Sequence, residues 1–306
     1  MTNKYNRTHM PFGNAFSVAD DEVMQLYTQD ASPAIALVDD DIHTKFLTEY
    51  QSWIMQTTNN RVHGLDEYKY ACYTNGTTEA FDKFYAKHST KRFRFFQGEY
   101  LYHRLSCRNN NYDWKYLEDS RLHKDDAVII SLPFSDTGNK HEDMDFILHN
   151  CSAMGIPVLL DCAYFGVCND FNFDLTHKCI TDVTFSLSKS LYAAHLRIGM
   201  RLTREDDDDP LFVTNKIGYI NRISAAIGRK LLKRFGPDYI YNKYRERQLE
   251  ICNILDVEPS NCVLFGIGGN KWYEYNRDRE TNRLSFHKYL NKNNDAELRD
   301  IANEKR

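Results

Sequence analysis

Four side chains of different chemistry follow two apolar runs of the sequence. Asp161 ends the first run, and Tyr164 lies three residues further along the chain. Lys189 comes just past the second run, and Arg197 follows eight residues later. A carboxylate that follows an apolar strand is costly to bury unless a positive group lies beside it. An amine, a carboxylate, a phenol and a guanidinium at one edge of a sheet could together hold a cofactor that withdraws electrons from its substrate.

These apolar runs predict strands of a sheet that is covered on both faces. The clearest are 127–131, 157–161 and 182–186, each apolar through its centre and polar at its C-terminal end. The segment 142–154 has the length and periodicity of a crossover helix between two of them. The pattern therefore predicts an α/β fold, in which ligands bind at the C-terminal ends of the strands.

The rest of the chain has a different pattern. An acidic run at 205–209, followed by Pro210, predicts a solvated loop before a helix. Beyond it we expect two helices, two strands and a last helix, at 211–234, 238–255, 262–265, 283–286 and 294–304. This succession predicts a small α+β unit.

The glycine cluster 266–269 raises a second possible site, because glycine-rich loops can hold phosphate. The cluster follows an expected strand, but the sequence after it begins a helix poorly. We therefore favour a simple turn at these glycines over a phosphate-binding loop.

Composition excludes several functional classes. Hydrophobic residues make up 42% of the chain and charged residues 27%, which is typical of a folded globular protein. A formal net charge of −4 disfavours a nucleic-acid-binding protein. No apolar run is long enough to predict a membrane span, and the N-terminus lacks the apolar stretch of a secretory signal. We therefore expect a cytoplasmic location, no membrane partner and no nucleic-acid partner.

The cysteine pattern predicts neither disulfides nor a metal site. The chain has 8 cysteines dispersed along its length, without the close pairing typical of zinc ligands. Without an export signal, free and mostly buried thiols are the simpler interpretation.

Five short motifs, taken in order, resemble the signature of fold type I aminotransferases (class I/II), which depend on pyridoxal 5'-phosphate (PLP). The motifs are Thr74-Asn-Gly-Thr-Thr-Glu-Ala80, Pro133-Phe-Ser-Asp-Thr-Gly138, Asp161-Cys-Ala-Tyr164, Ser186-Leu-Ser-Lys189 with Leu196-Arg-Ile-Gly199, and Asn282-Arg-Leu-Ser-Phe286. The resemblance implies a mixed, mostly parallel sheet with helices on both faces, together with a small α+β C-terminal domain.

The resemblance also implies a role for each residue of the central motifs. Lys189 would carry PLP as a Schiff base and then move a proton at the substrate. Asp161 would keep the ring nitrogen of PLP protonated, and Tyr164 would donate a hydrogen bond to the ring oxygen. The phosphate would be held by Gly76, Thr77, Thr78, Ser186, Ser188 and Arg197, partly at a helix N-terminus.

Two further cofactor contacts match the family pattern less closely. Tyr100 resembles the aromatic residue that stacks on the ring, although a core tyrosine remains an alternative in a chain with 20 tyrosines. Ser135 and Asp136 replace the family's Asn and Pro, so the ring contact of Ser135 is expected to be weaker. His195 stands where a glycine usually precedes this motif, which puts the usual close backbone approach in doubt.

Arg283 resembles the arginine that binds the α-carboxylate of the substrate. The alternative is an exposed arginine on a strand, since a match of three residues discriminates little. Asp161 has its own alternative as a helix cap, but a cap does not explain the positions of Lys189 and Arg197.

The family resemblance implies an aminotransferase that moves an amino group between an α-amino acid and a 2-oxo acid. The same residues suit a PLP-dependent lyase, decarboxylase or synthase, and a PLP-binding protein without turnover is a third possibility. The resemblance further implies a homodimer whose chain has an N-terminal arm (1–40), a large PLP-binding domain (41–235) and a small domain (236–306).

Overall fold

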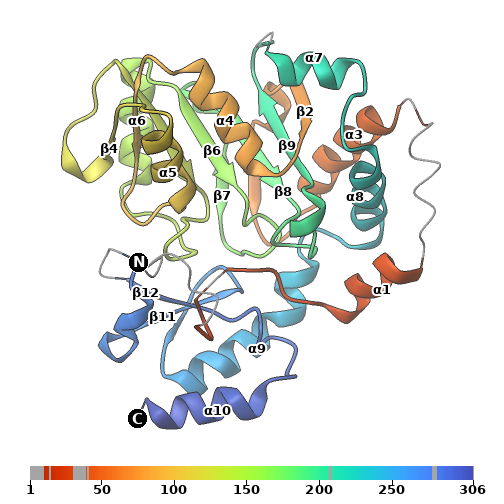
Figure 1. Ribbon diagram of the computed structural model, residues 1–306, viewed down its shortest axis with the longest axis vertical. Helices are drawn as coiled ribbons and strands as arrows, with labels where there is room; N and C mark the ends of the chain where they lie inside the picture. The colour runs from red at the N-terminus through yellow and green to blue at the C-terminus, as the bar shows by residue number, and fades with distance from the viewer. Residues whose placement is uncertain are drawn as a thin grey trace.

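A computed structural model describes residues 10–13, 15–29, 39, 41–206, 209–277 and 281–305, and these form a large α/β layer beside a smaller C-terminal sheet (Figure 1). The main sheet has seven strands in the order β2-β9-β8-β6-β5-β3-β4. These strands are β2 Tyr70–Thr74, β3 Arg92–Phe95, β4 Trp114–Tyr116, β5 Asp126–Ser131, β6 Val158–Cys162, β8 Ile180–Ser186 and β9 Gly199–Thr203. A short separate pair, β1 Arg61–His63 and β7 Asn172–Asp174, is parallel.

The direction of the strands confirms the expected α/β class. Strands β4, β3, β5, β6 and β8 pair in parallel, whereas β9 pairs antiparallel with both β8 and β2. The predicted strands at 127–131, 157–161 and 182–186 correspond to β5, β6 and β8, which lie next to one another. Their C-terminal ends therefore meet at one edge of the sheet.

Helices cover both faces of this sheet, and alternate residues of one strand face the two layers. The helices are α1 Asp21–Gln29, α3 Ile42–Ile54, α4 Thr77–Lys87, α5 Leu101–Asn109, α6 Met144–Met154, α7 Pro210–Lys216, α8 Arg222–Arg234, α9 Tyr239–Leu255 and α10 Asp295–Glu304. Ala127 and Ile129 of β5 pack in one apolar cluster with side chains of α4 and α5. Val128 and Ile130 pack in the other, larger cluster with side chains of α3, α6 and α8. The strand is apolar on both sides because both of its faces are buried.

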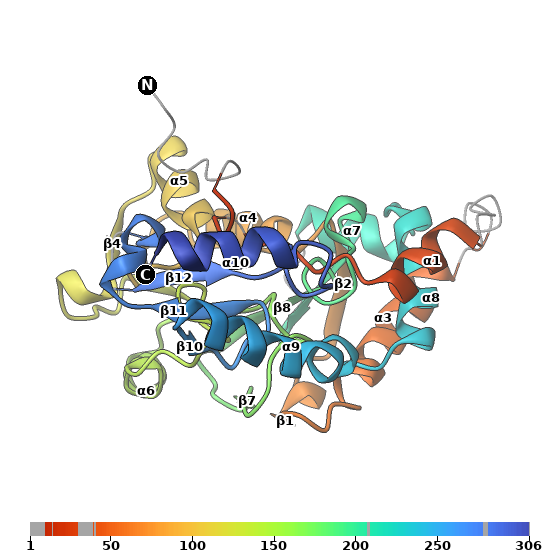
Figure 2. The ribbon, with the colours of Figure 1, turned by 90° about the horizontal axis from the view of Figure 1, so that it is seen from below.

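The C-terminal sheet consists of β10 Glu258–Pro259, β11 Phe265–Gly268 and β12 Asn282–Ser285, all antiparallel. Helices α9 and α10 lie beside it, as Figure 2 shows from below. The strand at 283–286 and the helices at 238–255 and 294–304 are confirmed within a residue or two. A division of the chain at residue 235 stays a prediction, and half of the arm at 1–40 lies outside the described residues.

The glycine cluster is not a turn, contrary to our expectation. Gly266 and Gly268 belong to β11, the central strand of the small sheet, and the strand expected at 262–265 begins only at Phe265. A Cβ added to Gly266 would lie 2.4 Å from the Phe286 ring, and one on Gly268 would lie 2.5 Å from the Trp272 ring. These glycines therefore allow large aromatic rings to pack directly on the strand, a requirement that comes from tertiary contacts.

The long helix expected at 211–234 is divided in two, and this expectation was also wrong. Helix α7 ends at Lys216 and α8 begins at Arg222, with Gly218 between them at a φ of +70°. The left-handed conformation of Gly218 ends the first helix. The start of α7 agrees with the sequence, because the Asp209 side chain accepts hydrogen bonds from two backbone amides and Pro210 opens the helix.

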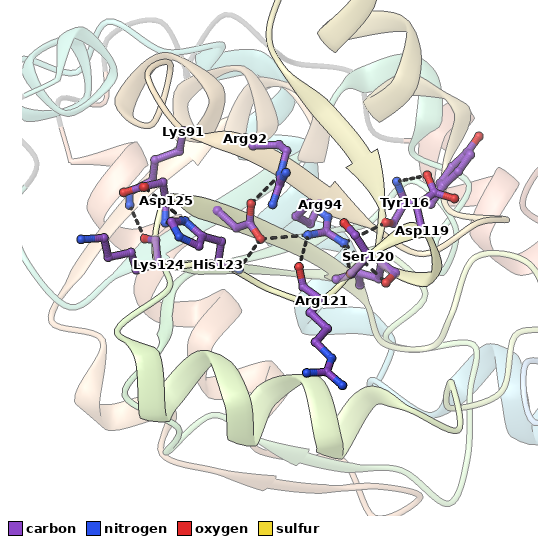
Figure 3. Close-up of polar contacts among 12 residues, drawn as sticks. Lys91, Arg92, Arg94, Tyr116, Asp119, Ser120, Arg121, His123, Lys124 and Asp125 are labelled. Atoms are coloured by element: carbon purple, nitrogen blue, oxygen red, sulfur yellow. Dashed lines mark hydrogen bonds and ion pairs between the residues drawn. The ribbon is translucent and has the colours of Figure 1, made fainter.

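At the N-terminal ends of the parallel strands, a buried arginine and aspartate form a dense polar network (Figure 3). Arg94 Nη1 donates to Asp126 Oδ2 at 2.9 Å and to the Arg121 carbonyl at 3.2 Å. Its Nη2 donates to the carbonyl oxygens of Tyr116, Leu117 and Ser120. This network joins β3, β5 and the loop between β4 and β5.

The 8 cysteines are free and buried, as expected. Among the described residues, no helix has the length and apolar character needed to cross a membrane. Within the same part of the chain, no group of three or more His, Cys, Asp and Glu side chains is placed to hold a metal ion.

Candidate active site

A cavity of about 500 Å³ opens at the C-terminal ends of β6 and β8. Eleven of the twelve side chains predicted for the cofactor and the substrate line it: Thr77, Thr78, Tyr100, Ser135, Asp161, Tyr164, Ser186, Ser188, Lys189, Arg197 and Arg283. They come from both sheets, from the start of α4 and from four loops. The remaining residue, Gly76, lies directly beside Arg197.

One end of the cavity is rich in hydrogen-bond donors. Arg197 Nη2 donates to the carbonyl of Asn75 at 2.9 Å and to Thr78 Oγ1 at 3.1 Å. Gly76 has a φ of +79°, and a Cβ there would lie 2.3 Å from Arg197 Nη2. Thr77 begins α4, whose N-terminal amides and dipole favour an anion. The end of the cavity at Arg197 is therefore built for a phosphate or a similar anion.

The replacement of a glycine by His195 does not obstruct this end. His195 is exposed in a short 3-10 helix, Ala194–Leu196. The close approach of backbones is instead made by Gly199, where an added Cβ would lie 2.9 Å from the Cα of Gly76. Gly199, at the start of β9, thus supplies the close approach to the β2–α4 turn that His195 had put in doubt.

Lys189 lies half-buried on the cavity wall. Its Nζ donates to the carbonyl of Ala15 at 2.5 Å, so the N-terminal segment passes directly over the site. Burial lowers the pKa of Lys189 to about 8, and the positive charge of Arg283 acts in the same direction. Near neutral pH the lysine therefore has a larger neutral fraction than an exposed lysine, as a nucleophile or a base requires.

Asp161 is buried at the end of β6, and its Oδ1 accepts a hydrogen bond from the Ala163 amide at 3.0 Å. Burial raises the pKa of Asp161 to about 8, and the nearby Glu99 carboxylate acts in the same direction. The charge of Lys189 acts in the opposite direction. A carboxyl group with this pKa holds a proton at neutral pH until a cation is bound beside it.

Glu99 is a cavity residue that our sequence analysis did not identify. Its two carboxylate oxygens accept hydrogen bonds from the backbone amide and the hydroxyl of Ser131, the last residue of β5. Burial raises the pKa of Glu99 to about 7. Glu99 therefore ties the loop that carries Tyr100 to the sheet edge, and it places a second acid near Asp161.

Tyr164 and Tyr100 differ in exposure although both line the cavity. Tyr164 is buried, its ring lies edge-on to Phe265 with centroids 5.3 Å apart, and burial raises its pKa to about 12. Tyr100 is 44% exposed, which excludes the alternative of a core tyrosine. Its ring is therefore available to a ligand.

Arg283 is not the exposed arginine that the sequence left as an alternative. It is 6% exposed, its guanidinium lies 4.4 Å from the centroid of the Phe265 ring, and Nη1 donates to the carbonyl of Ser135. Burial lowers the pKa of Arg283 to about 10, and the charge of Arg277 acts in the same direction. Ser135 thus contributes its backbone carbonyl to the position of this arginine.

Arg277 and Arg104 also line the cavity, and neither was identified from the sequence. Arg277 Nη1 donates to the carbonyl of Ser135 at 3.1 Å and lies 3.9 Å from the buried Asp136 carboxylate. Arg104 Nη1 donates to the Tyr116 hydroxyl at 3.1 Å. Neither arginine lies in a recognisable sequence motif. Only the tertiary structure brings each of them to the cavity.

No protein-family model matches the sequence, and a search of curated proteins finds no match either. Solved structures do match. The tyrosine aminotransferase of Leishmania infantum has a TM-score of 0.68 at 11% identity, covering 99% of this chain and 96% of that chain. A probable N-succinyldiaminopimelate aminotransferase of Thermus thermophilus has a TM-score of 0.67 at 16% identity, covering 96% and 93%.

The chain has the type I fold of these aminotransferases. A PLP-bound C-S lyase of Staphylococcus hominis has this fold as well, with a TM-score of 0.67 at 9% identity, covering 96% of this chain and 88% of that chain. The aminotransferase fold extends over nearly the whole chain, including the small C-terminal sheet. Fold and cavity therefore agree in position, since the cavity lies where open α/β sheets bind their ligands.

Proposed function

We propose that this protein is a PLP-dependent aminotransferase that moves an amino group between an α-amino acid and a 2-oxo acid. The observation that supports this best is the convergence of Lys189, Asp161, Arg197 and Arg283 on one cavity. These residues come from positions up to 122 residues apart in the chain, so their meeting is a property of the fold. The type I fold raises the expectation of this chemistry but does not by itself decide the reaction.

The residues present fit PLP. The phosphate would lie at the donor-rich end, held by Arg197, the hydroxyls of Ser186 and Ser188, and the amides that follow Gly76. The positive φ of Gly76 and its lack of a Cβ keep this turn open beside the guanidinium. When bound, PLP supplies a ring that withdraws electrons from the substrate Cα.

The chain's own residues would then place and move protons. Lys189, with a pKa lowered to about 8, would move a proton from the substrate Cα to the C4′ carbon of PLP. Asp161, with a pKa raised to about 8, would hold a proton at its carboxyl for the ring nitrogen. Arg283 would bind the α-carboxylate, a task that suits a planar pair of N–H donors.

We also propose a homodimer. Four apolar side chains on α7, α8 and their connection are exposed: Val213, Ile217, Tyr219 and Ile223. Exposed apolar side chains that gather on one part of the chain are typical of an interface, and two-fold pairs are the commonest oligomers. The cytoplasmic location and the division of the chain into three segments stay predictions.

A lyase is the second function that a specific observation favours, because the Staphylococcus hominis protein of the same fold is a C-S lyase. Decarboxylase chemistry, synthase chemistry and cofactor binding without turnover complete the set of candidate functions. Amino acids added to the PLP-loaded protein separate these possibilities. A transaminase converts bound PLP to pyridoxamine phosphate, a lyase or decarboxylase releases its product without that conversion, and a silent binder does neither.

The site assignment is tested by reduction with borohydride in the presence of PLP. We expect a pyridoxyl group on the peptide that contains Lys189, and no such group in Lys189→Ala. Lys230→Ala, a change on α8 outside the cavity, is the control. A wild-type digest in which Lys189 is unmodified while another lysine carries the group would overturn the assignment.

A further inference from the structure

The charges that line the cavity are unequal. Among the described residues, five lining side chains are basic (Arg104, Lys189, Arg197, Arg277 and Arg283) and two are acidic (Glu99 and Asp161). Burial raises the pKa of both acids, so their negative charge is reduced further at neutral pH. From this imbalance we infer that the cavity takes substrates with a second acidic group, and that Arg277 binds it. The inference rests on the proposed function for the identity of the reaction.

Three of the basic groups already have a task in the proposed function. Lys189 carries the reactive amine, Arg197 faces the anion end and Arg283 binds the α-carboxylate. Arg277 is left beside Arg283, since both donate to the carbonyl of Ser135. An amino acid with an uncharged side chain offers no partner for this additional guanidinium.

Arg277 and Arg283 form a close pair of like charges. Both donate through Nη1 to the same acceptor, the carbonyl oxygen of Ser135. The charge of Arg277 lowers the pKa of Arg283, which shows that the two guanidiniums repel each other. Such a pair is costly in a partly desolvated site unless anions lie beside it.

Asp136 offsets only part of this charge. The carboxylate of Asp136 is fully buried and lies 3.9 Å from Arg277 Nη1. Among the described residues of this pair's surroundings, one carboxylate against two guanidiniums leaves an excess of one positive charge. The α-carboxylate of any amino acid can balance Arg283, but a dicarboxylic substrate gives each guanidinium an anion of its own.

Arg277 is also accessible, as a ligand-binding group must be. Its side chain is 19% exposed, whereas that of Asp136 is completely buried. Within the described residues, its hydrogen bond to Ser135 uses Nη1, and the rest of the planar donor fork is open to a carboxylate. A purely structural arginine in the same place would affect all substrates alike.

The test compares two unreactive ligands of the same chain length, succinate and butyrate, by calorimetry on the PLP-loaded protein. We expect the wild type to bind succinate at least about 10-fold more tightly, as one charged hydrogen-bonded pair provides. Arg277→Gln should remove this preference by weakening succinate about 10-fold while changing butyrate less than about 2-fold. Arg277→Lys should keep part of the preference, because it keeps the charge but loses the fork.

Two control variants locate the effect. Arg299→Gln removes an exposed arginine of α10 and should leave both ligands unchanged. Arg104→Gln tests the other unassigned arginine, and a preference lost there but kept in Arg277→Gln would overturn the assignment. Equal binding of succinate and butyrate by the wild type, or equal weakening of both in Arg277→Gln, would also overturn it.

The same samples distinguish this inference from the proposed function. Aspartate and alanine are added to the PLP-loaded wild type, and conversion of the cofactor is followed by absorbance. If neither amino acid reacts but succinate is preferred through Arg277, the proposed reaction fails while the acidic subsite stands. If both react at similar rates and Arg277→Gln slows them equally, the reaction stands and the acidic subsite is refuted.

Discussion

The two ends of the parallel sheet contain similar charged residues in opposite electrostatic situations. At the N-terminal end, Asp126 accepts hydrogen bonds from Arg92 Nε, Arg94 Nη1 and the His123 amide, at 2.7, 2.9 and 2.8 Å. At the C-terminal end, Asp161 accepts one from the Ala163 amide among the described residues. Both aspartates are buried, at 1% and 5% exposure. The protein itself satisfies the hydrogen-bonding capacity of the Asp126 carboxylate, whereas that of Asp161 is satisfied only in part.

This difference distinguishes buried charges that stabilise the fold from buried charges that can bind a ligand. A buried charge with a complete set of partners joins strands and loops, and it needs nothing from outside the fold. A buried charge with an incomplete set keeps a perturbed pKa and an unused capacity for a ligand. The cavity around Lys189 is therefore the part of the sheet that a cofactor would complete.

The largest effect on the free energy of unfolding is expected from breaking the buried Arg94–Asp126 ion pair at the N-terminal end of the sheet. Arg94→Met removes the fully buried partner of Asp126 and leaves this buried carboxylate with only the partly exposed Arg92 and the His123 amide, so we expect a loss of about 3–5 kcal/mol in the free energy of unfolding. Urea unfolding followed by circular dichroism measures this loss. The double variant Arg94→Met, Asp126→Leu should recover much of it, since it removes the buried charge that has lost its buried partner. A single variant as stable as the wild type would contradict the comparison.

The second effect concerns the pKa of Lys189. In the cofactor-free protein, its reaction with trace acetic anhydride should reach half its maximum near pH 8, because burial and the charge of Arg283 lower the pKa to about 8 from 10.5. Mass spectrometry of the Lys189 peptide measures this midpoint. Arg283→Gln should move the midpoint upward. A wild-type midpoint near 10.5 would show that the site does not disfavour the charged amine.

A smaller change in the free energy of unfolding is expected from Asp161→Asn, and it is a gain in stability where Arg94→Met gives a loss. The pKa of Asp161 is about 8 in the fold and near 3.8 in the unfolded chain, so between these values only the folded state holds the proton. The stability of the cofactor-free wild type should therefore fall as the pH rises from about 4 to about 8. Asparagine does not titrate, so the variant should become increasingly more stable than the wild type as the pH rises towards about 8.

Melting temperatures of the two proteins at about pH 5 and about pH 8 measure this difference. The advantage of Asp161→Asn should be larger at the higher pH. The same variant should convert PLP with amino acids far more slowly, because the ring nitrogen loses its charge partner. A stability advantage of Asp161→Asn that is equal at both pH values would contradict the raised pKa of Asp161 in the folded protein.

The smallest effect is expected at an exposed ion pair. Lys140 Nζ lies 2.5 Å from Asp145 Oδ2, and both side chains are well exposed, at 43% and 74%. Lys140→Gln should change the free energy of unfolding by less than about 0.5 kcal/mol, because solvent screens such pairs. Urea unfolding beside Arg94→Met makes the comparison direct. A loss of similar size in both variants would mean that burial does not decide the strength of these pairs.

Much of the fold followed from local patterns. The apolar runs at β5, β6 and β8 predicted a sheet covered on both sides, and the structure confirms them as neighbouring strands. The prediction failed where long-range packing decides local structure. Gly266 and Gly268 belong to a strand because aromatic rings pack against them, and Gly218 divides a helix that looked continuous.

The sequence by itself determined the strand ends that carry Asp161 and Lys189, since a strand end follows from local hydrophobicity and the neighbouring polar residues. The motif order also predicted that Arg197 and Arg283 belong to the same site. Only the tertiary structure decided that Glu99 and Arg277 join them, because each lies on a loop without a periodic pattern. The pKa of a group likewise depends on burial and on charges that are distant in sequence, and these exist only once the chain has folded.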